Sequence, residues 1–209
     1  MPTCPQPPHP PAAPAATMPA AVGLAGPGGV GKSTTARALA ASMPFVVVPI
    51  STPIKAMMQA LYEAFGVDGE TIRRKLDGDL KRVPCAVLGG RTPTYAMQTL
   101  GTEWGRNLIA TDLWVRWWRR EAADCVAAGL VPVNDSVRFA EEADAVHELG
   151  GVVVGLAGRG DLAADHASEH GVPADATVTV AGAPADVAAA VLAVALTTIG
   201  GSAGNLGED

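Results

Sequence analysis

The sequence predicts a three-layer α/β fold, in which a parallel five-stranded sheet carries helices on both faces. The 209-residue chain has about the length of one domain, and 48% of its residues are apolar, which is ample for a buried core. Five short apolar runs, bounded by glycine, proline or aspartate, have the length of buried strands. Stretches of helical length lie between or after them. Alternating strands and helices are joined by right-handed crossovers, which produce a parallel sheet.

The predicted elements follow in order along the chain. Strands are expected at residues 21–25, 45–50, 130–133, 151–157 and 177–180. Helices are expected at residues 32–42, 54–65, 94–109, 112–128, 140–149 and 184–198, the last beginning with a proline, which suits a first turn. About eighty residues separate the second strand from the third, far more than one crossover needs. We therefore predict a helical insert over residues 53–128, in which the glycine-containing segment 67–90 is a mobile connection.

The two ends of the chain are predicted to lie outside the folded domain, which spans residues 19–199. Residues 1–18 are rich in proline and alanine and contain neither lysine nor arginine, so we interpret them as a disordered leader and not as a signal peptide. Residues 200–209 are predicted to be a disordered tail. The apolar stretch 187–199 is too short to span a bilayer, so no membrane segment is expected.

Charge and cysteine content exclude several classes of function. A net charge of −6 argues against binding to nucleic acid or to an anionic membrane, because both need clustered positive charge. Three cysteines without C-x-x-C spacing indicate neither a disulfide framework nor a zinc site. A reducing cytoplasm is the expected compartment. The expected partner is a small phosphorylated molecule, which needs no more than a local basic pocket.

A glycine-rich sequence between the first predicted strand and the first predicted helix matches the Walker A pattern, G-x-x-x-x-G-K-S. A strand, loop and helix in this order direct backbone N–H groups and the positive end of the helix at one small volume, which suits a di- or triphosphate. Lys32 would reach the β- and γ-phosphates, and the Ser33 hydroxyl would bind Mg²⁺. The sequence therefore predicts a P-loop NTPase fold that binds a nucleotide through Gly26, Gly28, Gly29, Val30, Gly31, Lys32, Ser33 and Thr34.

Further candidates follow the third and fourth predicted strands. Asp135 comes after the third strand, where a Walker B aspartate would hold Mg²⁺. Arg138 either forms an ion pair with Asp135 or Glu142, or contacts the γ-phosphate or the acceptor phosphate. Arg159 stands between two glycines after the fourth strand and is predicted to swing over a bound nucleotide, as an arginine on a lid would. The predicted catalytic residues are Lys32, Asp135, Arg138 and Arg159.

The segment 98–106 combines polar residues with two glycines inside a predicted helix. Each glycine costs about 1 kcal/mol relative to alanine in a helix, so a packing or ligand reason is expected. In one interpretation Gln98 and Glu103 read polar base edges, Trp104 stacks, and Arg106 holds a phosphate through two parallel bonds. In the other, the helix packs through its glycines and its polar residues are solvated.

Together these segments resemble the phage-type deoxynucleoside monophosphate kinases. The matching segments together span residues 22 to about 169, which is nearly all of the part expected to be ordered. The most specific of them is the run at residues 100–106. It is carried by the Walker A loop, Thr52-Pro53-Ile54-Lys55, Leu100-Gly101-Thr102-Glu103-Trp104-Gly105-Arg106, Asp112-Leu113-Trp114-Val115, Asp135-Ser136-Val137-Arg138-Phe139 with Glu142-Ala143, and His166-Ala167-Ser168-Glu169.

The resemblance implies ATP-dependent phosphorylation of a deoxynucleoside monophosphate to its diphosphate, with ATP and Mg²⁺ bound, in the host cytoplasm if the protein is phage-encoded. A basic residue is expected near position 94, where this chain has Thr94, and Arg91 is the candidate to replace it. The acceptor-binding residues implied by the resemblance are Lys55, Arg91, Gln98, Glu103, Trp104 and Arg106.

Two other functions fit the same residues. One is a kinase of another small phosphorylated acceptor, such as dephospho-coenzyme A. The other is a non-kinase ATPase or GTPase switch, whose nucleotide controls binding of a partner. The accepted base, the tolerance of ribose and the oligomeric state, with a homodimer among the options, stay open at this point.

Overall fold

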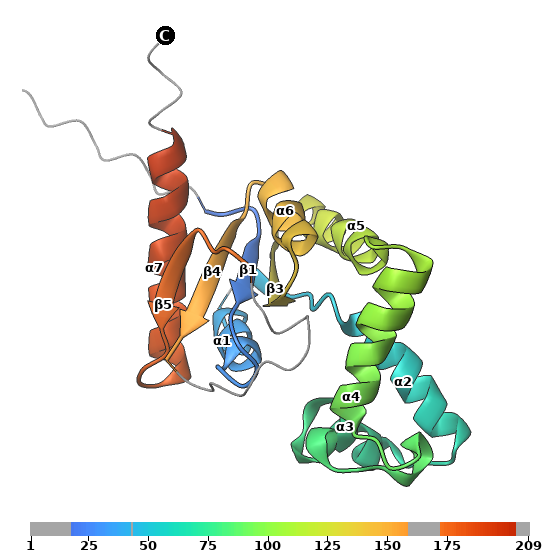
Figure 1. The fold of residues 1–209 in the computed structure, drawn as a ribbon. Coiled ribbons are helices and arrows are strands. Elements are labelled where there is room, and N and C mark those ends of the chain that lie inside the picture. Colours follow the sequence, from blue (N-terminus) through green and yellow to red (C-terminus); the bar gives the residue numbers. More distant parts are fainter. Residues whose placement is uncertain (1–17, 43, 159–171, 204–209) are drawn as a thin grey trace, which may run out of the picture.

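The computed structural model describes residues 18–42, 44–158 and 172–203, and it contains a five-stranded sheet whose paired strands are all parallel (Figure 1). The strands lie in the order β2-β3-β1-β4-β5, so the first strand is central. Each falls on one of the five predicted apolar runs, and the predicted α/β class with a parallel sheet is confirmed. Their bounds are β1 (Val22–Ala25), β2 (Phe45–Val47), β3 (Val131–Val137), β4 (Val152–Ala157) and β5 (Ala176–Thr179).

Helices cover both faces of this sheet. On one face, α1 (Lys32–Leu39) and α7 (Pro184–Ala203) share a core with Leu24 and Val133 of the sheet. On the other face, α5 (Leu113–Ala127) and α6 (Ala140–Glu148) bury Trp118 and Val146 completely. Because neither face meets water, the strands are apolar runs and do not alternate with polar residues.

Strand β3 is longer than predicted and irregular. The prediction ended it at residue 133 and placed Asp135 after the strand, whereas β3 continues through Asp135 to Val137. Its pairing with β1 shifts: Gly23 lies opposite Asn134, but Ala25 lies opposite Val137, so β3 has one extra residue there. Val133 packs in the core under α1 and α7, while Val137 packs under α5 and α6. Residues four apart on a regular strand share a face, so this bulge exchanges the two faces of β3.

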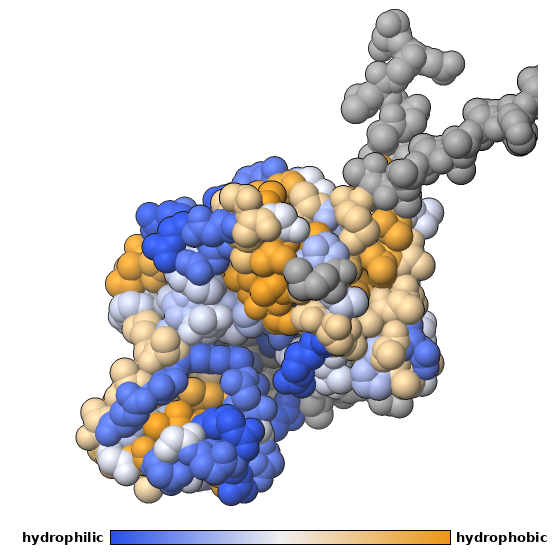
Figure 2. Space-filling model, turned by 180° about the vertical axis from the view of Figure 1, so that it is seen from behind, coloured by the Kyte–Doolittle hydropathy of each residue, from blue (hydrophilic) through white to orange (hydrophobic). Residues whose placement is uncertain are grey.

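The chain between β2 and α5 forms a helical lobe beside the sheet (Figure 1). Its small core is centred on Met58 and Tyr62 from one helix and Ile72 and Leu76 from the next. Seen from behind, hydrophilic residues line much of the indentation between the lobe and the sheet (Figure 2). The lobe contains α2 (Thr52–Ala64), α3 (Gly69–Asp77), the 3₁₀ helices η1 (Asp79–Arg82) and η2 (Ala86–Leu88), α4 (Pro93–Thr99) and the π-helix η3 (Leu100–Ile109).

The segment 67–90, predicted to be a mobile connection, is instead largely helical. The Asp68 carboxylate accepts a hydrogen bond from the Thr71 N–H at 2.9 Å and caps α3, which buries Ile72 and Leu76. The glycines misled the prediction because they stand at the ends of helices and not within them. Gly69 is the first residue of α3, and Gly78 ends that helix.

The last helix also differs from the prediction at its end. Residues 200–203, assigned to a disordered tail, continue α7. In the part of the chain that the structure describes, no helix combines the length and the apolar character needed to cross a bilayer.

Candidate active site

The loop between β1 and α1 requires glycine for its shape. Gly26 and Gly31 have φ values of 131° and 110°, a region that other residues rarely adopt. A Cβ at Gly26 would also lie 2.5 Å from the Leu156 carbonyl oxygen. Gly31 is the N-cap of α1, so the positive end of this helix opens onto the loop. The loop thus has a shape that glycine adopts readily, and it leads directly into the N-terminus of α1.

Lys32 is held inside this loop. Its side chain is buried, and its Nζ donates hydrogen bonds to the carbonyl oxygens of Gly26 at 2.6 Å and Pro27 at 3.0 Å. Ser33 and Thr34 follow on the exposed part of the first helical turn. The ammonium therefore lies at the centre of the turn, and two hydroxyl residues stand at its rim.

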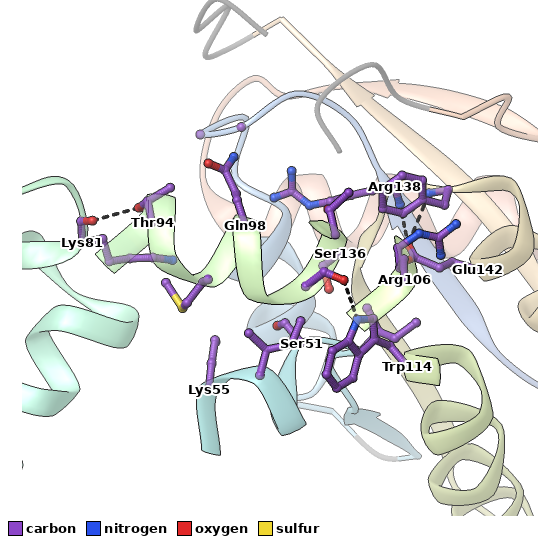
Figure 3. Close-up of a pocket in the computed structure, with 18 of the residues that line it drawn as sticks. Ser51, Lys55, Lys81, Thr94, Gln98, Arg106, Trp114, Ser136, Arg138 and Glu142 are labelled. Atoms are coloured by element: carbon purple, nitrogen blue, oxygen red, sulfur yellow. Dashed lines mark hydrogen bonds between the residues drawn. The ribbon is translucent and has the colours of Figure 1, made fainter. Parts of the chain in front are cut away.

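A cavity of about 370 Å³ lies between this loop, the end of β3 and the lobe (Figure 3). Gly28 and Gly29 form part of its wall on the side of the loop, and Ser136 and Arg138 form part of it on the side of the sheet. Ligands of open α/β sheets bind beyond the carboxyl ends of the strands, which is where these two walls meet. In Figure 3 the Arg138 side chain extends from this side toward Gln98 of the lobe.

The lobe contributes a polar face from α4 and η3. Thr94, Gln98, Thr102 and Arg106 all line the cavity and are spaced four residues apart. Residues four apart lie close to the same side of both an α-helix and a π-helix, so this spacing keeps the two side chains of α4 and the two of η3 on one side. The polar residues of the segment 98–106 therefore lie on two faces of the helix: Gln98, Thr102 and Arg106 face the cavity, whereas Glu103 does not line it.

The two glycines of η3 lie against close neighbours: a Cβ at Gly101 would lie 3.0 Å from Ile54 Cδ1, and Gly105 lies against Trp114. The indole Nε1 of Trp114 donates a hydrogen bond to the Gly101 carbonyl at 2.8 Å, and a Cβ at Gly105 would lie 2.3 Å from the indole ring. Trp114 itself lines the cavity. Both glycines are thus closely packed, and Trp114 also brings an aromatic wall to the cavity.

Arg106 is oriented by its neighbours. It is 9% exposed, its guanidinium carbon lies 3.8 Å from the centre of the Phe139 ring, and its Nη2 is 3.2 Å from Glu141 Oε1. Its Nη1 is buried and has no hydrogen-bond partner among the described residues. A buried, unpartnered donor on a cavity wall is a group that an anionic ligand can satisfy.

Glu142 lies close to Arg106 and supports the sheet side of the cavity (Figure 3). Its Oε2 accepts hydrogen bonds from the backbone N–H groups of Arg138 at 2.7 Å and Phe139 at 3.3 Å. Burial raises the pKa of this carboxyl to about 7, against the lowering effect of those hydrogen bonds and of Arg106 and Arg138. Glu142 therefore fixes the backbone from which Arg138 projects.

Three of the predicted acceptor-binding residues lie elsewhere. Glu103 and Trp104 line a second, apolar groove on another face of η3, with Met57 and Leu108. Arg91 is exposed and its guanidinium lies over the Tyr95 ring at 5.0 Å. The structure does not bring these three side chains to the cavity, whereas it does bring Lys55, Gln98 and Arg106 there.

The predicted metal ligands are Ser33 and Asp135. Asp135 is 8% exposed and lies within β3, two residues before its end. Among the described residues no cluster of three or more acidic, histidine or cysteine side chains could hold a metal by itself. Mg²⁺ at nucleotide sites takes few protein ligands, mostly oxygens, and keeps waters and phosphate oxygens. A hydroxyl and a single carboxylate fit that requirement. The predicted lid residue Arg159 lies outside the described residues.

The structure adds two basic residues that the sequence interpretation missed. Lys81 and Arg82, from η1, line the cavity. The Thr94 hydroxyl donates a hydrogen bond to the Lys81 carbonyl at 2.9 Å, so η1 is tied to α4. Burial lowers the pKa of the Lys81 ammonium, and the charge of Lys55 lowers it further. The available signal was a pair of adjacent basic residues in a segment assigned to a mobile connection.

The cavity concentrates positive charge in an acidic protein. Among the described side chains of its wall, five are basic and one, Glu142, is acidic. The whole chain has 15 lysines and arginines and a net charge of −6. The charge of this wall is therefore opposite in sign to that of the whole chain. Its basic residues are Lys55, Lys81, Arg82, Arg106 and Arg138.

Compared with known proteins, the chain matches no family model, and no curated protein matches it significantly.

Proposed function

We propose that this protein is a P-loop kinase that transfers the γ-phosphoryl group of ATP to a deoxynucleoside monophosphate. The observation that carries the proposal is the cavity wall, where five basic side chains face a glycine loop with a buried lysine at its centre. A donor and an acceptor that meet in such a site bring several phosphate charges together. Neutralising those charges and aligning the reactants is most of what catalysis of phosphoryl transfer requires.

The loop 26–31 and the start of α1 form the donor side. Backbone N–H groups of the turn and the Lys32 ammonium would hold the β- and γ-phosphates of ATP. Ser33 and Asp135 would hold Mg²⁺, which neutralises charge on the phosphates when bound. The Lys32 ammonium already lies within the turn, where it donates hydrogen bonds to the carbonyl oxygens of Gly26 and Pro27. When phosphate binds, phosphate oxygens would replace these two carbonyl oxygens as its acceptors.

The lobe forms the acceptor side. Ile54 and Met97 of the lobe, together with Trp114 of α5, supply apolar surface for a base and a sugar. Gln98 and Thr102 supply hydrogen bonds to polar base edges. Arg106 and Arg138 supply positive charge for the acceptor phosphate and for the phosphoryl group in transit. The cavity volume of about 370 Å³ is in the range of small-ligand sites.

The test is a coupled assay of ADP release, with ATP and Mg²⁺ and each of the four deoxynucleoside monophosphates in turn. We expect rapid ADP release with at least one of them and slow release without an acceptor. Rapid release with dephospho-coenzyme A alone would make the protein a kinase of a different acceptor. Slow hydrolysis that no acceptor accelerates would overturn the kinase proposal and favour a nucleotide switch.

A further inference from the structure

Lys81 occupies a position in the cavity that its place in the sequence does not suggest. It belongs to η1, in the lobe, yet its side chain lines the cavity that reaches the glycine loop. In Figure 3 the residue lies beside Thr94, on the side of the cavity opposite Arg138.

The charges that act on Lys81 come from both sides of the cavity. Apart from burial, the effects on its pKa come first from Lys55, then from Asp77, Arg138 and Asp135. Lys55 and Asp77 belong to the lobe, whereas Asp135 lies in β3 and Arg138 directly follows that strand. The Lys81 ammonium is therefore within electrostatic reach of the residues proposed to surround the transferred phosphoryl group.

A partly buried ammonium that feels the charge of two other cations is unfavourable unless anions offset them. Lys55 is paired with Asp77 across 22 residues of the chain, so that carboxylate is already engaged. The nearby cations Lys55 and Arg138 lower the pKa of Lys81, whereas a dianionic phosphate would raise it. Folding has already removed much of the water around this ammonium, so binding of phosphate does not incur that desolvation cost again. The attraction between the ammonium and a phosphate is also stronger where less water surrounds them.

Thr94 fixes the backbone of Lys81. Its hydroxyl donates to the Lys81 carbonyl at 2.9 Å, which connects α4 to η1 at the cavity wall. Thr94 stands where the family resemblance predicts a basic residue. The structure thus has a basic residue at this wall, supplied by η1 and held by the threonine.

We propose that Lys81 binds the phosphate of the acceptor, and that Thr94 is the residue that positions it. This proposal rests on the proposed kinase function. It assigns the acceptor-phosphate contact near position 94 to Lys81 and not to Arg91, which is exposed and stacked on Tyr95.

The test compares Lys81→Met with Arg91→Met, a control that removes another lobe cation outside the cavity. Calorimetric titration measures three ligands: the deoxynucleoside monophosphate that the wild type phosphorylates fastest, its nucleoside without phosphate, and ATP with Mg²⁺. We expect Lys81→Met to weaken monophosphate binding about 10- to 100-fold, as for loss of a hydrogen bond to a charged group. Nucleoside and ATP binding should change less than about 3-fold, and Arg91→Met should bind all three ligands like the wild type. Lys81→Arg, which keeps the charge, should retain most of the affinity.

Three outcomes overturn the proposal in distinguishable ways. Loss of ATP affinity with unchanged monophosphate affinity would place Lys81 on the donor side. Equal losses for monophosphate and nucleoside, in a variant that melts like the wild type, would assign Lys81 to the base or the sugar. A wild type that neither binds nor phosphorylates any of the four monophosphates would overturn the kinase function itself, and this assignment with it.

The positioning role of Thr94 has its own test. Thr94→Val removes the hydroxyl and should raise KM for the monophosphate roughly 3- to 10-fold with a smaller change in kcat, as expected for loss of a neutral hydrogen bond. Thr94→Ser should restore KM. Thr99→Val is the matched control, because the Thr99 hydroxyl bonds only within its own helix, to the carbonyls of Tyr95 and Ala96. An unchanged KM in Thr94→Val would show that η1 holds Lys81 without this bond.

Discussion

Trp114 holds the turn of η3 that carries Gly101, through a 2.8 Å hydrogen bond from its indole to the Gly101 carbonyl, and its ring fills the space beside Gly105. Both glycines are nearly inaccessible to solvent. One tryptophan from a helix on the sheet thereby fixes the distance between the sheet and the polar face that lines the cavity. Packing of this kind leaves no room for a methyl group.

Gly105→Ala tests this contact. The new Cβ would lie 2.3 Å from the Trp114 ring, so either the indole or η3 must shift. Overpacking of this kind costs about 1–3 kcal/mol, and a domain of this size loses roughly 2–4 °C in Tm for each kcal/mol. Gly69→Ala is the control, because a Cβ there meets nothing within 4 Å. Equal Tm values for Gly105→Ala and the wild type, measured by calorimetry, would contradict the packing described.

Lys32→Ala is expected to abolish phosphoryl transfer while the protein stays folded. The ammonium contacts two carbonyls of the turn, and the role proposed for it is to neutralise phosphate charge. Retention of more than about a tenth of the wild-type kcat, a loss below ~1.4 kcal/mol, would exclude Lys32 as a transition-state contact. Circular dichroism checks the fold, and Arg37→Ala, an exposed cation of the same helix, should keep full activity.

Arg106→Lys is expected to fail even though it preserves the charge. The planar guanidinium stacks on Phe139 and leaves Nη1 available on a buried wall, and an ammonium reproduces neither feature. We expect kcat/KM for the monophosphate to fall by a factor that corresponds to a loss of about 2–4 kcal/mol in transition-state stabilisation. ATP affinity measured without acceptor should stay near the wild-type value. Arg116→Lys, at an exposed position on α5, is the control; a matching loss there would indicate a non-specific effect.

Glu142 gives a prediction for the dependence of stability on pH. Its pKa of about 7 in the folded protein lies above the ordinary value of 4.5, so the folded state binds the proton more tightly than the unfolded state. The stability that this carboxyl contributes is present below about pH 4.5 and is lost as the pH rises through 7. Glu142→Gln cannot ionise, yet its side-chain oxygen can still accept from the Arg138 N–H.

Denaturant unfolding at pH 5 and pH 8 measures this effect. The fall in the free energy of unfolding between the two pH values should be smaller in Glu142→Gln than in the wild type, by on the order of 1–3 kcal/mol. Glu63→Gln, an exposed acid on α2, should follow the wild-type curve. If the Glu142→Gln curve also runs parallel to the wild-type curve, Glu142 does not titrate in this range.

The sequence was sufficient to predict the sheet and the loop after its first strand because both follow from local patterns. Apolar runs bounded by turn residues gave the strands, and the positive φ values at Gly26 and Gly31 explain why the loop contains glycine at those positions. The lobe was harder to predict because its glycines end helices, as Gly78 ends α3.

Which face of the helix each candidate side chain occupies depends on geometry that no local sequence pattern contains. A regular α-helix was assumed through residues 94–109, whereas η3 is a π-helix, and this wider turn sets which residues share a face with Arg106. Glu103 and Trp104 therefore lie in a different groove. Lys81 lines the cavity beside Thr94, which lies thirteen residues later in the chain and donates a hydrogen bond to its carbonyl, so the place of Lys81 could not be predicted from its neighbours in the sequence.

The extra residue in β3 makes the length of that strand critical. Deletion of one residue between Asn134 and Val137 would restore regular alternation, and every side chain that follows would then turn to the opposite face of the sheet. Arg138 would leave the cavity, and Val137 would leave the core beneath α5 and α6. Surface loops usually accept insertions and deletions, but this short segment should accept neither.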